Sequence, residues 1–425
     1  MKKLLTLFLI TPALIAHSQD TLKIMHYNLL NYGNYTSYCT TENNNHEEKD
    51  GYIRTIIAHE LPDIFTVNEI SNYEYYHNRI LTNVLNTDGR DYYMKGPVSN
   101  TALSDLVNMF YYNSEKIVLM SHVVVQHVLR DIDLYRLYYK TPETARGDTV
   151  FLNCIVAHLK AGNSDSDESE RAEMTANAME FLAGHAQPGN YLFMGDLNTY
   201  SSYEDCYQNL TGASANDFRF FDPVNLAGHW NNNGNFASVH TQSVTDNSTS
   251  CQAGGGCDDR FDHILATRQL MNGTMGLSYI TGSYRAVGQD GAHFNASITD
   301  APSNTAVPAN VLNALYNNSD HLPVRLDLKL TSGGIGGVAE QAWLSQTGVS
   351  LHSPEFALVF VTSPSETKVE LSVVSITGQV ILKEYCLLHI GRNEINLRIT
   401  GIPPGVYMIR LRDSQGRMAS LKMVK

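Results

Sequence analysis

Four apolar, strand-like runs of this chain each end in polar side chains, which restricts how the chain can fold. The polar ends are Asn28, Glu69, the pair Asp196 and Asn198, and the pair Asp320 and His321. Carboxylate, amide and imidazole groups are costly to bury unless they are paired or bind a metal. Four such ends in one domain therefore predict a shared site. Oxygen donors together with histidine suit a hard divalent cation and phosphate chemistry.

The order of the predicted elements indicates a mixed α/β domain between residues 20 and 330. Apolar runs predict strands at 22–30, 64–67, 108–112, 117–128, 134–139, 150–158, 191–194, 262–266 and 322–330. Helical spacing of apolar residues predicts helices at 49–59, 72–85 and 164–184, the last with a capping Ser164 and acidic residues in its first turn. A loop over 228–256, rich in Asn, Ser, Gly and Thr, is too long for a plain connector, which predicts a functional or mobile segment.

The two ends of the chain differ from this central part. Residues 1–18 have the form of a signal peptide, with Lys2 and Lys3 before an apolar run that is shorter than the ~20 residues of a membrane span. We therefore expect export without a transmembrane segment. A Gly-rich stretch predicts a linker over 331–354, and regular short strands separated by turns predict a small β-sandwich over 355–425.

Charge and cysteine content restrict the partners and the compartment. Residues 19–330 contain 19 Lys and Arg against 36 Asp and Glu, a net charge of −17, which is awkward for a nucleic-acid binder unless cations offset it. Export permits disulfides, and Cys251 and Cys257 flank a flexible Gly-rich loop, so we expect these two cysteines to form one. Cys154 lies in an apolar run and is expected to be a buried thiol.

Six motifs taken in order resemble the endonuclease/exonuclease/phosphatase superfamily, the group that includes pancreatic deoxyribonuclease. They span about residues 22–330 and are Tyr27-Asn28-Leu29, Pro62-Asp63 through Glu69, Val156-Ala157-His158, Met194-Gly195-Asp196-Leu197-Asn198, Arg260-Phe261-Asp262-His263, and Ser319-Asp320-His321-Leu322-Pro323. The resemblance implies a four-layer α/β sandwich of two packed mixed β-sheets in a catalytic domain over 19–330. The site is then expected at the strand ends between the sheets.

The resemblance also implies a role for each polar strand end. It makes Glu69 the metal-ligand glutamate, with Asn28 and Asp320 completing or supporting the metal shell. His321 becomes the base that deprotonates water, and Asp262 orients it. His158 would polarise the phosphate or protonate the leaving oxygen, while Asp196 and Asn198 position the nucleophile and bind phosphate. The expected cation is Mg²⁺ or Mn²⁺, and a structural Ca²⁺ is left open.

Each residue also has a structural interpretation. Glu69 could meet solvent at a strand end, a lone His158 is more often a core histidine, and Asp196, Asn198 or Asp320 could cap turns. On the helix at 164–184 we expect Arg171 to be solvated or to act as a cap. We expect His263, which follows Asp262 on the same strand, to point to the opposite face.

The last 70 or so residues resemble the sorting domain of the type IX secretion system of Bacteroidetes. The matching elements include Gly405-Val406-Tyr407 and a basic terminus at Lys422 and Lys425. This resemblance implies that the outer-membrane secretion machinery is a partner and that the protein is secreted or held at the cell surface. The alternative is an ordinary immunoglobulin-like accessory module.

Together these features predict a secreted, monomeric, metal-dependent phosphodiester hydrolase, with nucleic acid, DNA or RNA, as its substrate. Two alternatives use the same site, namely a phospholipid phosphodiesterase of the sphingomyelinase kind and an inositol phosphate phosphatase. A sphingomyelinase usually needs an exposed aromatic loop, and the 228–256 loop contains Trp230 and Phe236 but is mostly polar. A third alternative, from another class, is a non-catalytic surface adhesin.

Overall fold

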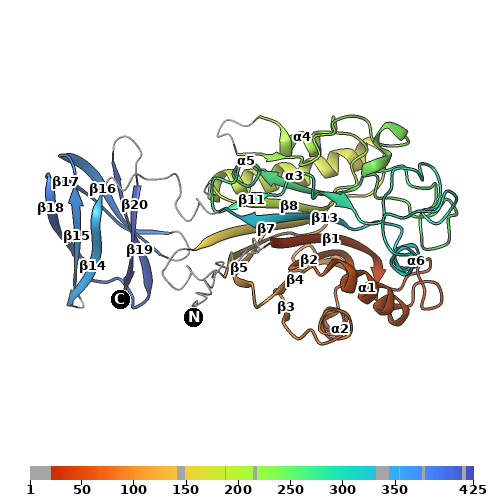
Figure 1. Cartoon of the computed structure of the whole chain (residues 1–425), viewed down its shortest axis with the longest axis horizontal. Coiled ribbons are helices and arrows are strands. Elements are labelled where there is room, and N and C mark those ends of the chain that lie inside the picture. The colour runs from red at the N-terminus through yellow and green to blue at the C-terminus, as the bar shows by residue number, and fades with distance from the viewer. Residues whose placement is uncertain are drawn as a thin grey trace, which may run out of the picture. The chain divides into compact units, whose positions relative to one another are not determined.

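The computed structural model describes residues 21–140, 149–186, 188–213, 218–331, 344–353, 355–375, 379–413 and 418–425. The predicted signal peptide and most of the predicted linker lie outside these residues. The chain divides into two compact units (Figure 1). Of the described residues, the larger unit contains those within 21–137, 153–272 and 277–330, and the smaller unit contains those within 138–152, 273–276 and 331–425. Within the described part of the chain, no helix has both the length and the apolar character needed to cross a membrane.

The first sheet of the larger unit has seven strands. They are β1 (Thr21–Tyr32), β2 (Ile64–Ser71), β3 (Tyr93–Lys95), β4 (Leu106–Asn113), β11 (Leu277–Tyr279), β12 (Arg285–Ala286) and β13 (Val324–Leu330). The order is β11-β13-β1-β2-β4-β3, with β12 also paired to β13. β1 runs parallel to β2 and antiparallel to β13, so the sheet is mixed.

The second sheet has six strands. They are β5 (Ile117–Gln126), β6 (Ile132–Tyr139), β7 (Val150–His158), β8 (Tyr191–Asp196), β9 (Phe220–Phe221) and β10 (Asp262–Thr267). Their order is β5-β6-β7-β8-β10-β9. β7 and β8 are parallel whereas β8 and β10 are antiparallel, so this sheet is mixed as well. The central strands are buried on both faces, which explains why they are continuous apolar runs in the sequence.

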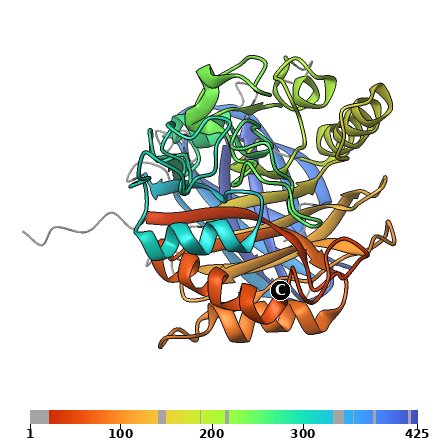
Figure 2. The same cartoon turned by 90° about the vertical axis from the view of Figure 1, so that its right-hand side faces the viewer.

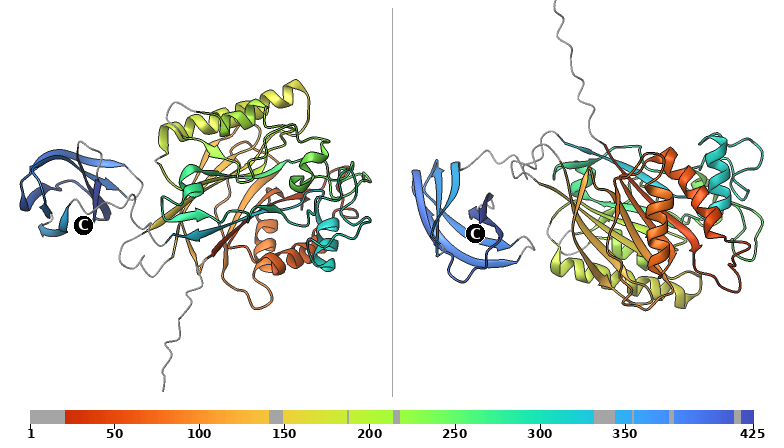
Figure 3. Two further views of the ribbon diagram at one scale, coloured as in Figure 1. Left: turned by 45° about the horizontal axis from the view of Figure 1, so that its top comes forward. Right: turned by 90° about the horizontal axis from the view of Figure 1, so that it is seen from below.

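Helices form the two outer layers (Figures 1 and 3). The first sheet carries α1 (His46–Glu60), α2 (Glu74–Arg79), the π-helix η1 (Ile80–Leu85) and α6 (Ala309–Asn318). The second carries α3 (Asp165–His185), α4 (Asp205–Thr211) and α5 (Arg268–Asn272). α1 and α6 lie side by side (Figure 2). The predicted four-layer α/β sandwich with two packed mixed sheets is confirmed, and the three predicted helices are present.

α3 shows how local sequence determines one of these layers. Ser164 caps it, because its hydroxyl accepts from the backbone N–H of Asp167 while the Asp167 carboxylate accepts from the backbone N–H of Ser164. Met174, Ala178 and Leu182 recur at a spacing of four residues and are buried. They join one apolar cluster with residues of the second sheet, including Ile155, Phe193 and Leu265. Capping and periodicity together hold the helix on the sheet.

The smaller unit is an antiparallel β-sandwich. Its strands are β14 (Ser345–Ser353), β15 (Phe356–Ser363), β16 (Thr367–Ser375), β17 (Val380–Leu388), β18 (Gly391–Arg398), β19 (Val406–Asp413) and β20 (Met418–Val424). Two sheets, ordered β14-β15-β18 and β17-β16-β19-β20, enclose an apolar core. β14 lies within the stretch 331–354 that the sequence predicts as a linker. It is a polar edge strand, so it lacks the apolar alternation that marks the other strands.

The disulfide differs from the prediction. Cys251 pairs with Cys39, across a sequence separation of 212 residues, whereas Cys257 is a buried free thiol that accepts a hydrogen bond from Gln289 Nε2 at 3.0 Å. Proximity along the chain favoured Cys257, but the fold places the loop after β1 against the loop before β10. A hydrogen bond from Asn43 Nδ2 to Ser250 Oγ, at 2.6 Å, joins the same two loops. Cys154 is buried as predicted.

Removal of this disulfide is expected to lower the free energy of unfolding by about 2–5 kcal/mol, because the cross-link closes a long loop of the unfolded chain. The variant is Cys39→Ser with Cys251→Ser, and urea denaturation of the oxidised protein is the measurement. Wild type treated with dithiothreitol should behave like the variant. Cys386→Ser, which removes a free thiol in the smaller unit, is the control. A urea midpoint that dithiothreitol leaves unchanged would contradict the expected contribution of the disulfide to stability.

Candidate active site

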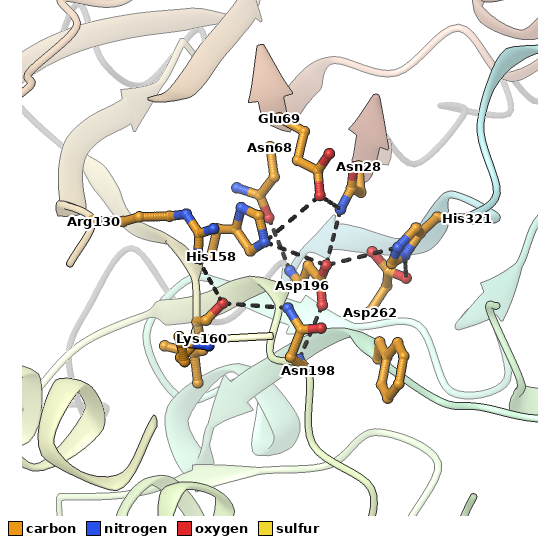
Figure 4. A network of polar contacts seen from close by, with 12 residues as sticks. Asn28, Asn68, Glu69, Arg130, His158, Lys160, Asp196, Asn198, Asp262 and His321 are labelled. Atoms are coloured by element: carbon orange, nitrogen blue, oxygen red, sulfur yellow. Dashed lines mark hydrogen bonds and ion pairs between the residues drawn. The ribbon is translucent and has the colours of Figure 1, made fainter. Parts of the chain in front are cut away.

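Strand register brings the polar residues of the second sheet into one row. His158, the last residue of β7, is paired with Asp196 at the end of β8, and Asp196 is paired with Asp262 at the start of β10. In the first sheet Asn28 of β1 is paired with Asn68 of β2, next to Glu69. The two sheets meet at this end of the strands, where Asn68 Oδ1 accepts from the backbone N–H of Asp196 at 2.9 Å (Figure 4).

Glu69 lies where the two sheets approach each other. The Asn28 amide donates to Glu69 Oε1 at 3.0 Å and to Asp196 Oδ2 at 2.9 Å, so it bridges the two carboxylates. The backbone N–H of Asn31 donates to Glu69 Oε2 at 3.0 Å. Glu69 has a φ of 54°, an uncommon conformation for a residue other than glycine. Such backbone strain concentrates at functional sites.

Asp262 and His321 form a buried pair. His321 Nδ1 donates to Asp262 Oδ2 at 2.7 Å, which leaves Nε2 directed toward Asp196 Oδ2, 3.8 Å away. Gln242 Nε2 lies 2.8 Å from His321 Nε2, within hydrogen-bond distance. Burial by itself lowers the pKa of His321, but the Asp262 and Asp196 carboxylates outweigh burial and raise this pKa well above its usual value. The pair has the arrangement of a base oriented by a carboxylate.

His158 faces the same carboxylates from the other side. Its Nε2 lies 3.6 Å from Asp196 Oδ2 and 3.8 Å from Glu69 Oε1 (Figure 4). Burial, reinforced by the charge of Arg130, lowers the pKa of His158 well below its usual value, so the ring is neutral. A neutral imidazole can donate to a phosphate oxygen or bind a metal.

The donor set fits a divalent cation. One ligand atom each from Glu69, His158 and Asp196 lies within 4.8 Å of the other two. Burial raises the pKa of Asp196, and the Asp262 and Glu69 carboxylates raise it further, which shows that a positive charge beside these groups would be stabilising. The two carboxylates supply oxygen ligands of the kind that hard divalent cations prefer, and the imidazole adds a nitrogen ligand that suits transition metals.

The remaining predicted site residues lie around this group. Asn198 has a φ of 49°, and its backbone N–H donates to Asp196 Oδ1 at 2.9 Å. Asp320 is not part of the three-residue group, and its Oδ2 accepts from the backbone N–H of Ala253 at 3.0 Å. The ligand roles of Asn28 and Asp320 therefore stay predictions. His263 points away from the site, as predicted, and its Nε2 contacts the carbonyl of Arg260.

The structure adds residues that the sequence did not reveal. His26 Nε2 lies 4.0 Å from Asp262 Oδ1. His26 is two positions before Asn28 on β1, and because side chains alternate along a strand, both residues point to the same face, which could have identified His26. Arg130 donates to the carbonyl of Leu159, and the nearby Glu69 and Asp196 carboxylates oppose the lowering of its pKa by burial. No pattern in the sequence marks Arg130 or Gln242 as a site residue. Arg130 lies in a turn between β5 and β6, and Gln242 lies in the long polar loop.

Arg171 is not solvated, contrary to the prediction from sequence. It is fully buried, and its Nη2 lies 2.7 Å from Glu204 Oε2. Its Nη1 donates to the carbonyls of Lys160 and Gly162, while Glu204 Oε1 accepts from the backbone N–H of Tyr200. The ion pair therefore joins the loop after His158 to the loop after Asn198. The helix pattern did not show it because the partner lies on another element.

Solved structures are similar to the chain at low sequence identity. An endonuclease/exonuclease/phosphatase of Beutenbergia cavernae is 14% identical, with 95% of this chain and 100% of that chain covered and a TM-score of 0.40. The human Nocturnin catalytic domain is 13% identical, with 73% and 95% covered and a TM-score of 0.45. A mannosyl-6-phosphatase of Bacteroides thetaiotaomicron is 14% identical, with 72% and 99% covered and a TM-score of 0.42. No curated protein matches the sequence.

These similarities are too distant to support a statement about activity, which depends on the geometry of the site. The C-terminal part of the chain is more definite. The predicted sorting domain is confirmed by a family model, and such a domain indicates export to the cell surface or beyond. Residues 354–425 match the family described as a secretion system C-terminal sorting domain.

Proposed function

We propose that the chain is an exported, divalent-metal-dependent phosphodiesterase that cleaves nucleic acid. The observation that carries the proposal is the buried Asp262–His321 pair, joined at 2.7 Å, whose second ring nitrogen lies 3.8 Å from Asp196 Oδ2 and 2.8 Å from the Gln242 amide nitrogen. Water attack on phosphorus needs a base that accepts a proton of the water and a cation that neutralises charge on the phosphate, and this site has both the base and a cluster of cation ligands. A surface adhesin does not require a buried histidine oriented by a carboxylate. All the polar residues expected from the six motifs are present, which argues against a decayed enzyme.

In the proposed reaction His321 Nε2 takes a proton from the attacking water. Asp262 fixes the ring through Nδ1 and stabilises the imidazolium that forms. The water oxygen forms a bond to phosphorus as the bond to the leaving oxygen breaks, and the leaving oxygen takes up a proton from solvent. Asp196 and Asn198 position the water and the phosphate, and His158 donates to a phosphate oxygen.

A bound cation would be held by Glu69 and Asp196, with the amide of Asn28 keeping the two carboxylates together. It would neutralise charge on the phosphate oxygens and offset the carboxylates that raise the pKa of His321. Arg130 adds a fixed positive charge beside Glu69 and Asp196. Asp320, held by the loop over 228–256, supports this arrangement from the side of His321.

Two observations bear on the alternative substrates. One favours a phosphoester smaller than nucleic acid, and the other argues against a phospholipid. The net charge of −17 over residues 19–330 works against tight binding of duplex DNA, which favours a smaller substrate such as an inositol phosphate. Trp230, the candidate membrane anchor, is fully buried, and its Nε1 donates to the carbonyl of Leu226 at 2.8 Å. This tryptophan therefore cannot insert into a lipid surface, and the sphingomyelinase alternative is weakened.

The test is a substrate panel for the purified mature protein. We expect hydrolysis of bis(4-nitrophenyl) phosphate, single-stranded or duplex DNA, or RNA in the presence of Mg²⁺ or Mn²⁺, and none in EDTA. Sphingomyelin and inositol phosphates complete the panel. Full activity in EDTA would exclude a metal-dependent enzyme. Hydrolysis of lipid or inositol phosphate without cleavage of any nucleic acid would move the assignment to that alternative.

A further inference from the structure

The long polar loop over 228–256 reaches the catalytic pair through the side chain of Gln242. The amide nitrogen of this residue lies 2.8 Å from His321 Nε2, the ring nitrogen that faces Asp196, and 3.5 Å from Asp320 Oδ2. The other ring nitrogen of His321 is bonded to Asp262. Both nitrogens of the proposed base therefore have a polar neighbour, and the reaction proposed above gives no role to the one at Nε2.

The backbone of Gln242 is held beside the segment that leads into β10. Its N–H donates to the carbonyl of Asp259 at 3.1 Å. Its carbonyl accepts from the backbone N–H groups of Asp258 and Asp259, at 2.9 and 2.8 Å. Because β10 begins at Asp262, these bonds fix the starting point of the Gln242 side chain relative to the carboxylate that orients the base.

Thr241, the preceding residue, connects the same segment to both members of the pair. Thr241 is fully buried, and its hydroxyl oxygen accepts from the backbone N–H of Asp262 at 3.1 Å. Its carbonyl accepts from the backbone N–H of Leu322, the residue after His321, at 2.7 Å. The segment of Thr241 and Gln242 therefore bridges the two parts of the chain that carry the pair, and backbone hydrogen bonds on both sides hold it there.

The neighbours of the Gln242 amide indicate what it can do at this position. An ionised carboxylate only accepts hydrogen bonds, so Asp320 favours the orientation in which the NH₂ group of Gln242 faces this side of the site. The side chain of Gln242 is only partly buried, and such side chains change rotamer rapidly. The amide can therefore make room for a water molecule beside His321 Nε2 and donate to the oxygen of that water, while its backbone stays in place.

We propose that Gln242 is a further catalytic residue, which positions the attacking water against His321. The inference rests on the proposed function and adds a residue to its mechanism. The water oxygen accepts a hydrogen bond from Gln242 Nε2 and forms the bond to phosphorus, while one of the water hydrogens passes as a proton to His321 Nε2. The bond to the leaving oxygen breaks, and that oxygen takes up a proton from solvent. Gln242 neither gains nor loses a proton, and its contribution is to hold the water in the orientation for attack.

The experiment replaces Gln242 by methionine, which has a similar length but no amide, and by glutamate, which accepts hydrogen bonds but does not donate when ionised. We expect kcat on bis(4-nitrophenyl) phosphate to fall about 10²-fold in both variants, the cost of misplacing a reacting group, while KM changes little. Gln289→Met is the matched control and should keep the wild-type kcat. Gln289 supports the same loop by donating to the carbonyl of His240 at 2.9 Å, and it donates to Cys257 Sγ at 3.0 Å.

A double-mutant cycle separates a role in catalysis from a role in loop structure. If Gln242 holds the water that His321 deprotonates, Gln242→Met should cost little further kcat in the His321→Gln background, because residues that act as a unit are not additive. Binding of Mn²⁺, followed by calorimetry, should be the same in wild type and Gln242→Met. An unchanged or higher kcat in both Gln242 variants, the same loss in Gln289→Met, the same loss in both backgrounds, or weakened Mn²⁺ binding would each overturn the inference.

Wild type and His321→Gln, assayed on the same substrate, report on the proposed function separately. Hydrolysis that requires a divalent cation and His321 but not Gln242 would overturn the inference and leave the phosphodiesterase in place. Failure of the wild-type protein to hydrolyse any substrate of the panel would reject both.

Discussion

Replacement of His321 by alanine is expected to lower kcat by about 10²- to 10⁴-fold with Mg²⁺ present, the usual contribution of a general base. The physical reason is the loss of the nitrogen that accepts the proton of the attacking water. The measurement is kcat on bis(4-nitrophenyl) phosphate, with KM determined in parallel. KM should change much less, because His321 acts on the water rather than on the leaving group.

Burial of the pair makes a stability control necessary. His321→Ala leaves the fully buried Asp262 without its 2.7 Å partner, which costs free energy of unfolding on the order of 1–3 kcal/mol. His321→Gln keeps an amide that can donate to Asp262 but lacks the base, so it should be better folded and equally inactive. His127→Ala, at an exposed histidine, is the matched control. Near-wild-type hydrolysis by a folded His321→Gln protein would exclude this histidine as the base.

Replacement of Glu69 by glutamine is expected to raise the Mg²⁺ concentration needed for half-maximal activity at least 10- to 100-fold, since changes outside the ligand shell already cost that much. The variant keeps the size of the side chain and removes one of the two carboxylates that form the proposed cation site together with His158. The measurement is activity titrated with MgCl₂ after EDTA treatment, with direct Mn²⁺ binding followed by calorimetry as a readout that is independent of catalysis.

The control for Glu69→Gln is Glu74→Gln, five residues further along the chain. Glu74 is exposed and pairs only with Lys95 among the described ion pairs, so its loss should leave the Mg²⁺ titration unchanged. Wild-type protein in EDTA should be inactive and should recover when Mg²⁺ or Mn²⁺ is added. An identical Mg²⁺ requirement in wild type and Glu69→Gln would remove Glu69 from the cation site.

Several parts of the fold were predictable because their signals are local. Ser164 and the acidic residues after it mark the start of α3, and the spacing of Met174, Ala178 and Leu182 gives its buried face. Continuous apolar runs marked the strands that are buried on both faces. β14 was missed because a polar edge strand has no such run, and Arg171 was misjudged because its partner Glu204 lies on another element.

The site residues were predictable one by one because a polar residue at the end of an apolar, buried strand is easily recognised in the sequence. The residues that contact them could not be predicted in this way. Asn68, Arg130 and Gln242 contact the site through long-range packing, and the disulfide joins Cys39 to a cysteine 212 residues away. Local spacing favoured Cys257 for that bond, since nothing in the sequence shows which loops meet at the end of the two sheets.

The sequence by itself determined the α/β class, the sorting domain and the identities of the polar strand ends, because these depend on periodicity, composition and short motifs. Tertiary structure alone decided that His158, Asp196 and Asp262 lie in one row, since only strand register places them side by side. It also decided that Glu69 reaches Asp196 through Asn28, because two sheets must pack before residues 168 positions apart can share a hydrogen bond.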